Sequence, residues 1–132
     1  MENKKIIEGN KLIAEFMEVK NVREYELNSK HKCLIISDDD GFIDYVEGIN
    51  FLSYNDNWNR IMHVVEKIKK LEFEFNTFSD YTKTEKYRNE VRISELSVNK
   101  YCRILIRNTD MLDAIFNAVV EFIKWYNENK NN

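Results

Sequence analysis

The chain has 132 residues, of which 20 are lysine or arginine and 23 are aspartate or glutamate, so its formal net charge is −3. This balance excludes bulk attraction to nucleic acid or to an anionic membrane as the basis of function. Hydrophobic residues make up 43% of the chain, enough to build a core, and the length predicts one domain over residues 1–132. No apolar run is long enough to cross a bilayer, and the start MENKKIIEGNK lacks the apolar region of a signal peptide. We therefore expect a cytoplasmic protein.

Three stretches carry apolar residues at steps of three and four, the spacing that lines one face of an α-helix. They predict helices over about 10–18, 57–71 and 109–129. The helical pattern of the first stretch covers residues 3–18, but Gly9 interrupts it, so a start near Asn10, with that residue as cap, is the favoured alternative. The expected buried stripe of the second helix consists of Trp58, Ile61, Met62, Val65 and Ile68.

The last helix is the most apolar element of the chain. Its expected stripe consists of Leu112, Ile115, Phe116, Val119, Ile123 and Tyr126. A helix this apolar must be covered on most of its surface, so the rest of the fold is expected to pack on it. Trp125 lies one step off the stripe, which leaves open whether it belongs to the core or to a contact surface. Burial is the favoured interpretation, because aromatic side chains dominate protein cores.

Alternating and short apolar segments fill the chain between the helices. The predicted strands are a short irregular one within 20–32, one around CLII at 32–37, a strand or irregular chain over 42–52, and strands over 71–78, 87–96 and 101–107. Three consecutive strands between two amphipathic helices suggest an antiparallel meander. The predicted fold class is α+β: one domain with an antiparallel sheet of three to five strands and three helices packed on it.

The most acidic stretch, ISDDDGFIDYVE, resembles the calcium-binding loop of an EF-hand. The side chains at ligand positions are Asp38, Asp40, Asp44 and Glu47, with Gly41 at the turn. However, Ile36 stands where the first carboxylate ligand belongs, and no helix is predicted after Glu47. An acidic turn between strands is therefore the favoured interpretation, and calcium binding by the Asp38–Glu47 segment is left open.

Other residues that could support chemistry lack partners at the required spacing. Cys33 and Cys102 are far apart and lie in apolar segments, as expected of buried thiols in a reducing compartment. His31 and His63 have no acidic or cysteine partner at metal-binding spacing, so His63 is interpreted as a partly buried structural residue. The chain has no Gly-x-Ser-x-Gly motif and no glycine-rich phosphate loop. We therefore expect no enzyme activity, no bound metal and no cofactor.

A basic surface is predicted on the outward face of the last two strands. Its candidate binding residues are Arg88, Arg92, Lys100, Tyr101, Arg103 and Arg107. Local basic charge beside an aromatic side chain is typical of surfaces that bind RNA backbone or an acidic protein groove. The alternative is an ordinary solvated sheet face, with cross-strand pairs to Glu90 and Glu95.

Three sequence blocks carry a resemblance to known proteins. They are NKLIAEFM at Asn10–Met17, NWNRIMHVVEKI at Asn57–Ile68 and AIFNAVVEFIKWYNE at Ala114–Glu128. Together they resemble a family of small uncharacterised proteins from phages and prophages of Bacteroidetes-type bacteria. Asn59 replaces the Asp usual in the middle block, and His63 stands where Pro is common. The resemblance implies a small soluble product of a mobile element, acting in the cytoplasm of a bacterial host, and it brings no activity or catalytic residues.

Small phage proteins without an active site commonly act by binding, so two hypotheses follow by association. The first is a non-enzymatic binding protein that inhibits a host defence system, comparable to an anti-CRISPR protein acting on an effector protein or its guide RNA. The expected partner is a host protein or ribonucleoprotein, and RNA could bind through the basic face. The alternative is a phage accessory protein with a structural or replication role, which could be a homo-oligomer. The sequence identifies neither the target nor the oligomeric state.

Overall fold

The computed structural model describes residues 3–20, 22–28, 31–36, 52–85, 88–96 and 104–130. Contacts divide the chain into two compact units, Met1–Tyr54 and Asn55–Asn132, which are described separately. The acidic segment Asp38–Glu47 and the predicted strand over 42–52 lie outside the described residues, apart from Leu52. The acidic turn favoured for this segment therefore stays a prediction, and calcium binding stays open.

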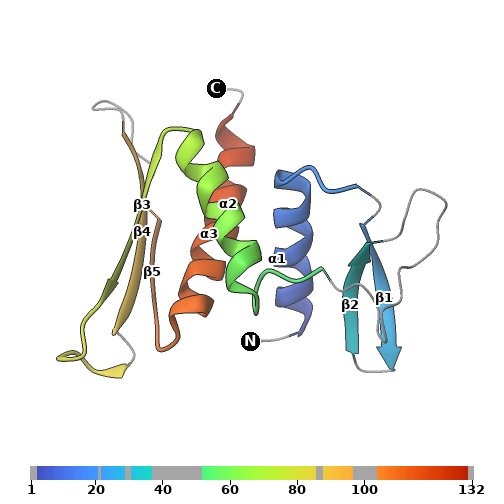
Figure 1. Ribbon diagram of the computed structural model, residues 1–132, viewed down its shortest axis with the longest axis horizontal. Helices are drawn as coiled ribbons and strands as arrows, with labels where there is room; N and C mark the ends of the chain where they lie inside the picture. The colour runs from blue at the N-terminus through green and yellow to red at the C-terminus, as the bar shows by residue number, and fades with distance from the viewer. Residues whose placement is uncertain are drawn as a thin grey trace. The chain divides into compact units, whose positions relative to one another are not determined.

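The first unit contains a helix and a two-stranded hairpin (Figure 1). Helix α1 spans Asn3–Phe16, and strands β1 (Val22–Asn28) and β2 (His31–Ile36) pair antiparallel, with a register shift between Glu26 and Asn28. The short strand expected within 20–32 and the strand around CLII are both confirmed.

The expected start of the first helix near residue 10 is wrong, because α1 begins at Asn3 and runs through Gly9. A glycine inside a helix costs only about 1 kcal/mol, which tertiary packing can offset, and Gly9 is buried. Asn10 is not a cap. Its side chain is 3% exposed, and its Oδ1 accepts a hydrogen bond of 2.9 Å from the backbone N–H of Tyr54. Asn10 thus links the middle of α1 to the end of the first unit.

The second unit begins with helix α2, Trp58–Lys70. Asn57 caps it, since its side chain accepts a hydrogen bond of 3.0 Å from the backbone N–H of Arg60. Chain direction then reverses within two residues, because Glu72 adopts φ = 70° between the helix and the next strand. Leu71 and Glu72 are therefore turn residues and not part of the alternating strand that the sequence predicted.

Three strands follow: β3 (Phe73–Ser79), β4 (Asn89–Glu95) and β5 (Ile104–Asn108). They form an antiparallel sheet in the order β3-β4-β5, which confirms the predicted meander. The chain then enters helix α3, Met111–Asn129, which Asp110 caps by accepting a hydrogen bond of 2.9 Å from the N–H of Asp113. Helices α2 and α3 cover one face of this sheet, so the α+β fold class is confirmed (Figure 1). One domain over the whole chain stays a prediction.

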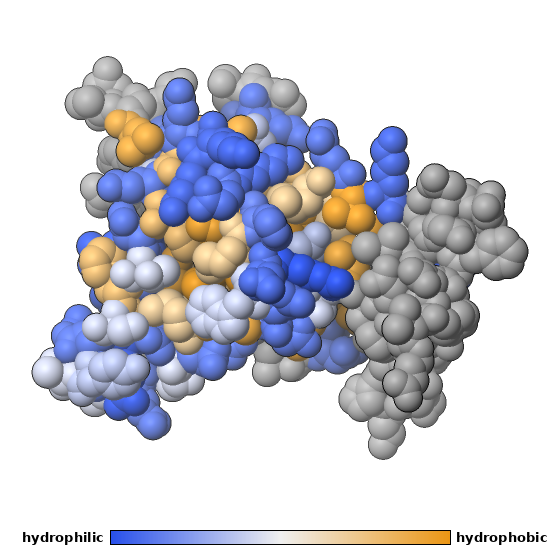
Figure 2. Space-filling model, in the orientation of Figure 1, coloured by the Kyte–Doolittle hydropathy of each residue, from blue (hydrophilic) through white to orange (hydrophobic). Residues whose placement is uncertain are grey.

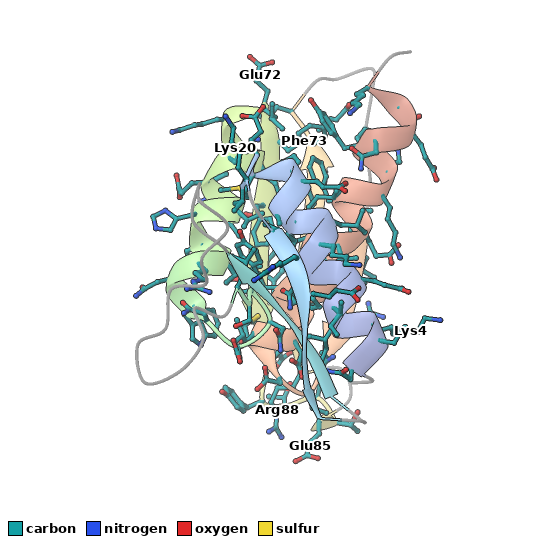
Figure 3. The ribbon with its side chains drawn as sticks, turned by 90° about the vertical axis from the view of Figure 1, so that its right-hand side faces the viewer. Lys4, Lys20, Glu72, Phe73, Glu85 and Arg88 are labelled. Carbon is teal, nitrogen blue, oxygen red and sulfur yellow. The ribbon has the colours of Figure 1, made fainter. Side chains whose placement is uncertain are left out.

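The core of the second unit lies between the sheet and these two helices. Val91 and Ile93 on β4 are 0% exposed. On α3, Phe122 is 0% exposed and Phe116 is 1% exposed. Phe73 packs edge-on against Phe122, with ring centroids 4.8 Å apart, and Figure 3 shows Phe73 beside α3 while Glu72 points away from the ribbon. Trp125 is half-buried with its ring 5.8 Å from that of Phe73. Its assignment to the core side of α3 is therefore supported.

The stripe predicted for α2 is partly wrong. Ile61, Val64, Val65 and Ile68 are the buried side chains of this helix. Trp58 is 49% exposed at the first position of the helix, and Met62 is 36% exposed one residue after the buried Ile61. His63 is exposed, so its interpretation as a partly buried residue is also wrong.

Asn89 joins the sheet to the start of α3. It is 7% exposed; its Oδ1 accepts a hydrogen bond of 2.9 Å from the Ser79 hydroxyl, and its Nδ2 donates one of 2.8 Å to the carbonyl of Thr109. One buried amide therefore connects β3, β4 and the segment that leads into α3.

Candidate functional site

The strand register places basic and apolar side chains together on the sheet face opposite α2 and α3. Glu90 lies opposite Arg107 on β5 and opposite Phe78 on β3, and Arg92 lies opposite Leu105. Because directly paired residues in an antiparallel sheet project to the same side, these five side chains share one face. We call this set, Phe78, Glu90, Arg92, Leu105 and Arg107, the outer-face cluster.

Glu90 is the centre of the outer-face cluster. The Nε of Arg92 donates to its Oε2 at 2.7 Å, and the Nε of Arg107 donates to its Oε1 at 2.9 Å. The side chain of Glu90 is only 10% exposed, whereas those of Arg92 and Arg107 are 55% and 42% exposed. One shielded carboxylate therefore holds two exposed guanidinium groups in fixed positions.

These contacts set the protonation of Glu90. Burial acts to raise its pKa, but the hydrogen bonds and positive charges of Arg107 and Arg92 together outweigh burial, so the pKa lies below its ordinary value of 4.5. Glu90 is thus ionised at neutral pH, and it cancels one of the two arginine charges beside it.

Apolar surface adjoins this charge cluster. Phe78 is 47% exposed and Leu105 is 46% exposed. The guanidinium carbon of Arg92 lies 5.1 Å from the centroid of the Phe78 ring, within the range of a cation–π interaction. On the face of the molecule that Figure 2 shows, hydrophobic residues likewise reach the surface among hydrophilic ones. The outer-face cluster therefore combines exposed apolar side chains with oriented arginines.

Of the six predicted binding residues, the structure brings together Arg92 and Arg107. Lys100, Tyr101 and Arg103 lie outside the described residues. Arg88 was expected on the strand but precedes it, and its guanidinium carbon lies 4.9 Å from the Tyr81 ring centroid. Figure 3 shows Arg88 and Glu85 at the opposite end of the sheet from Glu72.

The connection between β3 and β4 is a compact turn. The Asp80 carboxylate accepts hydrogen bonds from the hydroxyl and the backbone N–H of Thr82, at 2.6 and 3.0 Å, and these bonds lower its pKa. The backbone N–H of Asp80 donates to the carbonyl of Arg88 at 2.9 Å and closes the hairpin. Arg88 and Tyr81 therefore belong to this turn and not to the outer-face cluster.

Sequence reasoning missed Phe78 and Leu105 as surface residues. The alternation of the strands indicated their exposure. Phe78 is an even-numbered residue, like Glu74 and Asn76 on the outer side of the strand, and Leu105 lies between the inward-facing Ile104 and Ile106. Glu90 was expected only as a member of a solvated cross-strand pair. Its shielded position between two arginines required the register of all three strands.

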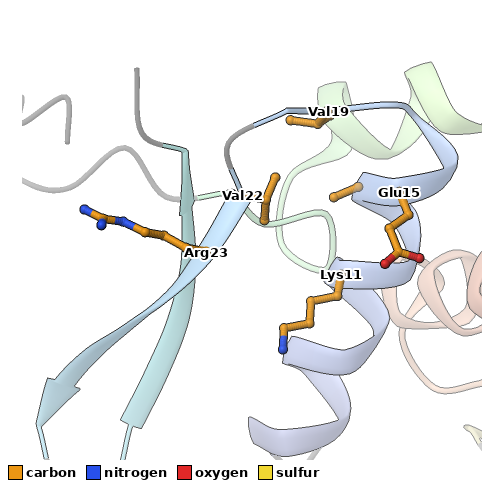
Figure 4. A pocket seen from close by; sticks show the side chains of 6 residues that line it. Lys11, Glu15, Val19, Val22 and Arg23 are labelled. Atoms are coloured by element: carbon orange, nitrogen blue, oxygen red, sulfur yellow. The ribbon is translucent and has the colours of Figure 1, made fainter. Parts of the chain in front are cut away.

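The first unit contains an open pocket of about 440 Å³ between α1 and β1 (Figure 4). Its lining consists of Lys11, Ala14, Glu15, Val19, Val22 and Arg23. Lys11 forms an ion pair with Glu24 on β1. The charged side chains Lys11 and Glu15 are exposed, so this pocket lacks the shielded polar groups of a site built for a ligand.

Within the described part of the chain, no three histidine, cysteine, aspartate or glutamate side chains are grouped closely enough to hold a metal ion. None of the helices described is both long and apolar enough to cross a membrane.

Comparison of the chain with protein-family models, with curated proteins and with solved structures finds no match. Function must therefore be inferred from the residues and their arrangement.

Proposed function

We propose that this chain is a small non-enzymatic binding protein that recognises a host protein through its outer-face cluster. The observation that supports the proposal is the pair of arginines that Glu90 holds beside the exposed side chains of Phe78 and Leu105. Arginine and aromatic residues are enriched at the energetically important centres of protein interfaces. Side chains held in place before binding also lose less conformational entropy when the complex forms.

A protein partner fits this surface better than RNA. RNA backbone recognition depends on accumulated positive charge, whereas Glu90 cancels one of the two arginine charges here and the whole chain carries −3. Two large side chains exposed by nearly half of their surface instead favour a partner with its own apolar contact area. An acidic and partly apolar protein surface is the complement of the cluster.

The identity of the partner class rests on the resemblance to phage and prophage proteins. Such an origin supports a role as an inhibitor of a host defence system, comparable to an anti-CRISPR protein that binds an effector. In this proposal the chain acts by occupying a surface of the effector, and it needs no chemistry of its own.

The test is capture of host proteins on the immobilised full chain, with and without nuclease, followed by mass spectrometry. A triple variant, Glu90→Gln, Arg92→Gln and Arg107→Gln, neutralises the cluster without leaving Glu90 charged and unpaired. We expect it to reduce recovery of a defence effector at least about tenfold, since central interface residues often contribute about 2 kcal/mol or more.

A matched control removes one acid and two bases from the helices: Glu66→Gln, Lys69→Gln and Lys124→Gln, whose ion pairs lie at 3.6 to 3.8 Å. This control should capture the effector as well as the unmodified chain does. Recovery that disappears with nuclease would instead identify RNA as the partner. Equal capture by both triple variants, or no specific capture, would refute the proposal.

A further inference from the structure

The open edge of β3 is a second feature of the described surface that can bind a partner. The sheet order is β3-β4-β5, so among the described residues β3 pairs with β4 alone. Strand edges carry unpaired backbone N–H and C=O groups, and proteins usually protect them with lysine, proline or bulges. Strand β3, FEFNTFS, has none of these, and its register with β4 is unbroken from Phe73 to Ser79.

The hydrogen-bonding direction along β3 follows from its two ends. The carbonyl of Glu72 accepts from the N–H of Leu96 at 3.3 Å, and the N–H of Asp80 donates to the carbonyl of Arg88 at 2.9 Å. Even-numbered residues therefore direct their backbone groups towards β4. Odd-numbered residues direct theirs to the open edge, and these are Phe73, Phe75, Thr77 and Ser79.

The other edge of the described sheet belongs to β5. Even-numbered residues of β4 bond to β3, so its odd-numbered residues bond to β5, where they lie opposite Ile104, Ile106 and Asn108. Within the described part of β5, Ile104–Asn108, Leu105 and Arg107 are directed outward.

We propose that the β3 edge binds the β3 edge of a second copy of this chain, antiparallel, about a two-fold axis at Asn76. In this register Phe75 pairs with Thr77 of the second copy, and Phe73 pairs with Ser79 of the second copy. All four outward-directed residues then form hydrogen-bonded pairs, and the two sheets join into one.

Charge supports a second copy as the occupant of the edge. The same register places Glu74 of the second copy opposite Phe78, whose ring lies 5.1 Å from the guanidinium carbon of Arg92. Directly opposite residues in an antiparallel sheet have Cβ atoms about 5 Å apart. The Glu74 carboxylate of the second copy therefore comes close to the Arg92 guanidinium group that lies over Phe78. No like charges lie directly opposite each other in this register. The strand is thus complementary to itself in hydrogen bonding and in charge.

The experiment measures the molar mass of the full chain by sedimentation equilibrium, without any partner. We expect twice the 15.9 kDa of the single chain. Thr77→Pro removes an N–H directed to the open edge, where proline is tolerated, and should give the single-chain mass with the far-UV circular dichroism retained. Leu105→Pro makes the same change at the β5 edge and should keep the double mass.

The proposal is refuted if the unmodified chain has a mass of 15.9 kDa, or if Leu105→Pro and not Thr77→Pro separates the copies. A disulfide test covers the case in which Thr77→Pro does not fold. With Cys33 and Cys102 replaced by serine, Asn76→Cys should cross-link on oxidation, because residue 76 faces itself at a Cα separation of about 4.5 Å. Thr77→Cys should not cross-link, because residue 77 lies opposite residue 75 of the second copy. Equal cross-linking of the two variants would also refute the register.

Discussion

The two faces of the three-stranded sheet are built from alternate residues of the same strands, and they are stabilised in different ways. On β4, Val91 and Ile93 are fully buried under the helices, while their sequence neighbour Arg92 is 55% exposed on the other side. Each face nevertheless contains one shielded polar residue, Asn89 on the inner side and Glu90 on the outer side. The inner face is therefore stabilised mainly by packing and the outer face mainly by charge, although each contains a polar residue.

The two shielded residues show what this contrast achieves. Asn89 binds neutral partners, the Ser79 hydroxyl and the Thr109 carbonyl, and so fixes how the chain enters α3. Glu90 binds two guanidinium groups that remain accessible to solvent. The inner face thus uses its polar residue to hold the fold, whereas the outer face uses its polar residue to orient side chains that a partner can contact.

The largest expected effect is a loss of stability when a packed side chain of the inner face is shortened. Ile93→Ala should lower the free energy of unfolding by about 2–5 kcal/mol, because Ile93 is fully buried and the substitution leaves a cavity. Leu105→Ala on the outer face should change it by only about 0.5 kcal/mol, since Leu105 is 46% exposed. Urea denaturation followed by circular dichroism measures both. Similar losses for the two variants would break the comparison.

A smaller effect tests the buried amide. Asn89→Ala should cost about 1–3 kcal/mol, because it leaves the Thr109 carbonyl and the Ser79 hydroxyl without a shielded partner. The control is Asn76→Ala, which removes an amide from the outer side of β3 and should cost less than about 0.5 kcal/mol. If the two substitutions cost the same, Asn89 does not connect the strands to α3 as its geometry indicates.

The sequence predicted this layout as far as local periodicity carries. Alternation predicted a strand over 87–96, where β4 spans Asn89–Glu95, and helical spacing predicted a helix over 57–71, where α2 spans Trp58–Lys70. Predictions from periodicity were wrong where burial depended on the rest of the fold and not on local sequence. Gly9 suggested a break, but it is buried within α1, and Trp58 fits the apolar stripe of α2 although it is 49% exposed at the start of that helix.

The binding surface was harder to predict, because it depends on register between strands. The sequence placed Arg92 and Arg107 on one face but counted Glu90 as one of several solvated acids. Only the pairing of Glu90 with Arg107 across β4 and β5 shows that both arginines share this carboxylate. At Arg92 and Arg107, the described part of the expected positive surface, the net charge is therefore lower than the two arginines alone imply.

The smallest expected effect tests the charge at the centre of the outer face. Glu90→Gln should lower the free energy of unfolding by roughly 1 kcal/mol at pH 7, because neutral hydrogen bonds replace charge-assisted ones at partly exposed arginines. The folded-state pKa of Glu90 lies below the ordinary 4.5, so its stabilising contribution is present above that pH and is lost as pH falls through the folded-state value. The difference between Glu90→Gln and the unmodified chain should therefore shrink below pH 4.5.

Urea denaturation at a series of pH values between neutral and acidic conditions measures this difference. The matched control is Glu8→Gln, which neutralises an exposed carboxylate on α1 and should leave a small difference at every pH. A Glu90→Gln difference that stays constant through the acidic range would mean that the carboxylate acts by shape and hydrogen bonding alone. The arginines of the outer face would then be held without its charge, and the proposed distinction between a packed face and a charge-organised face would fail.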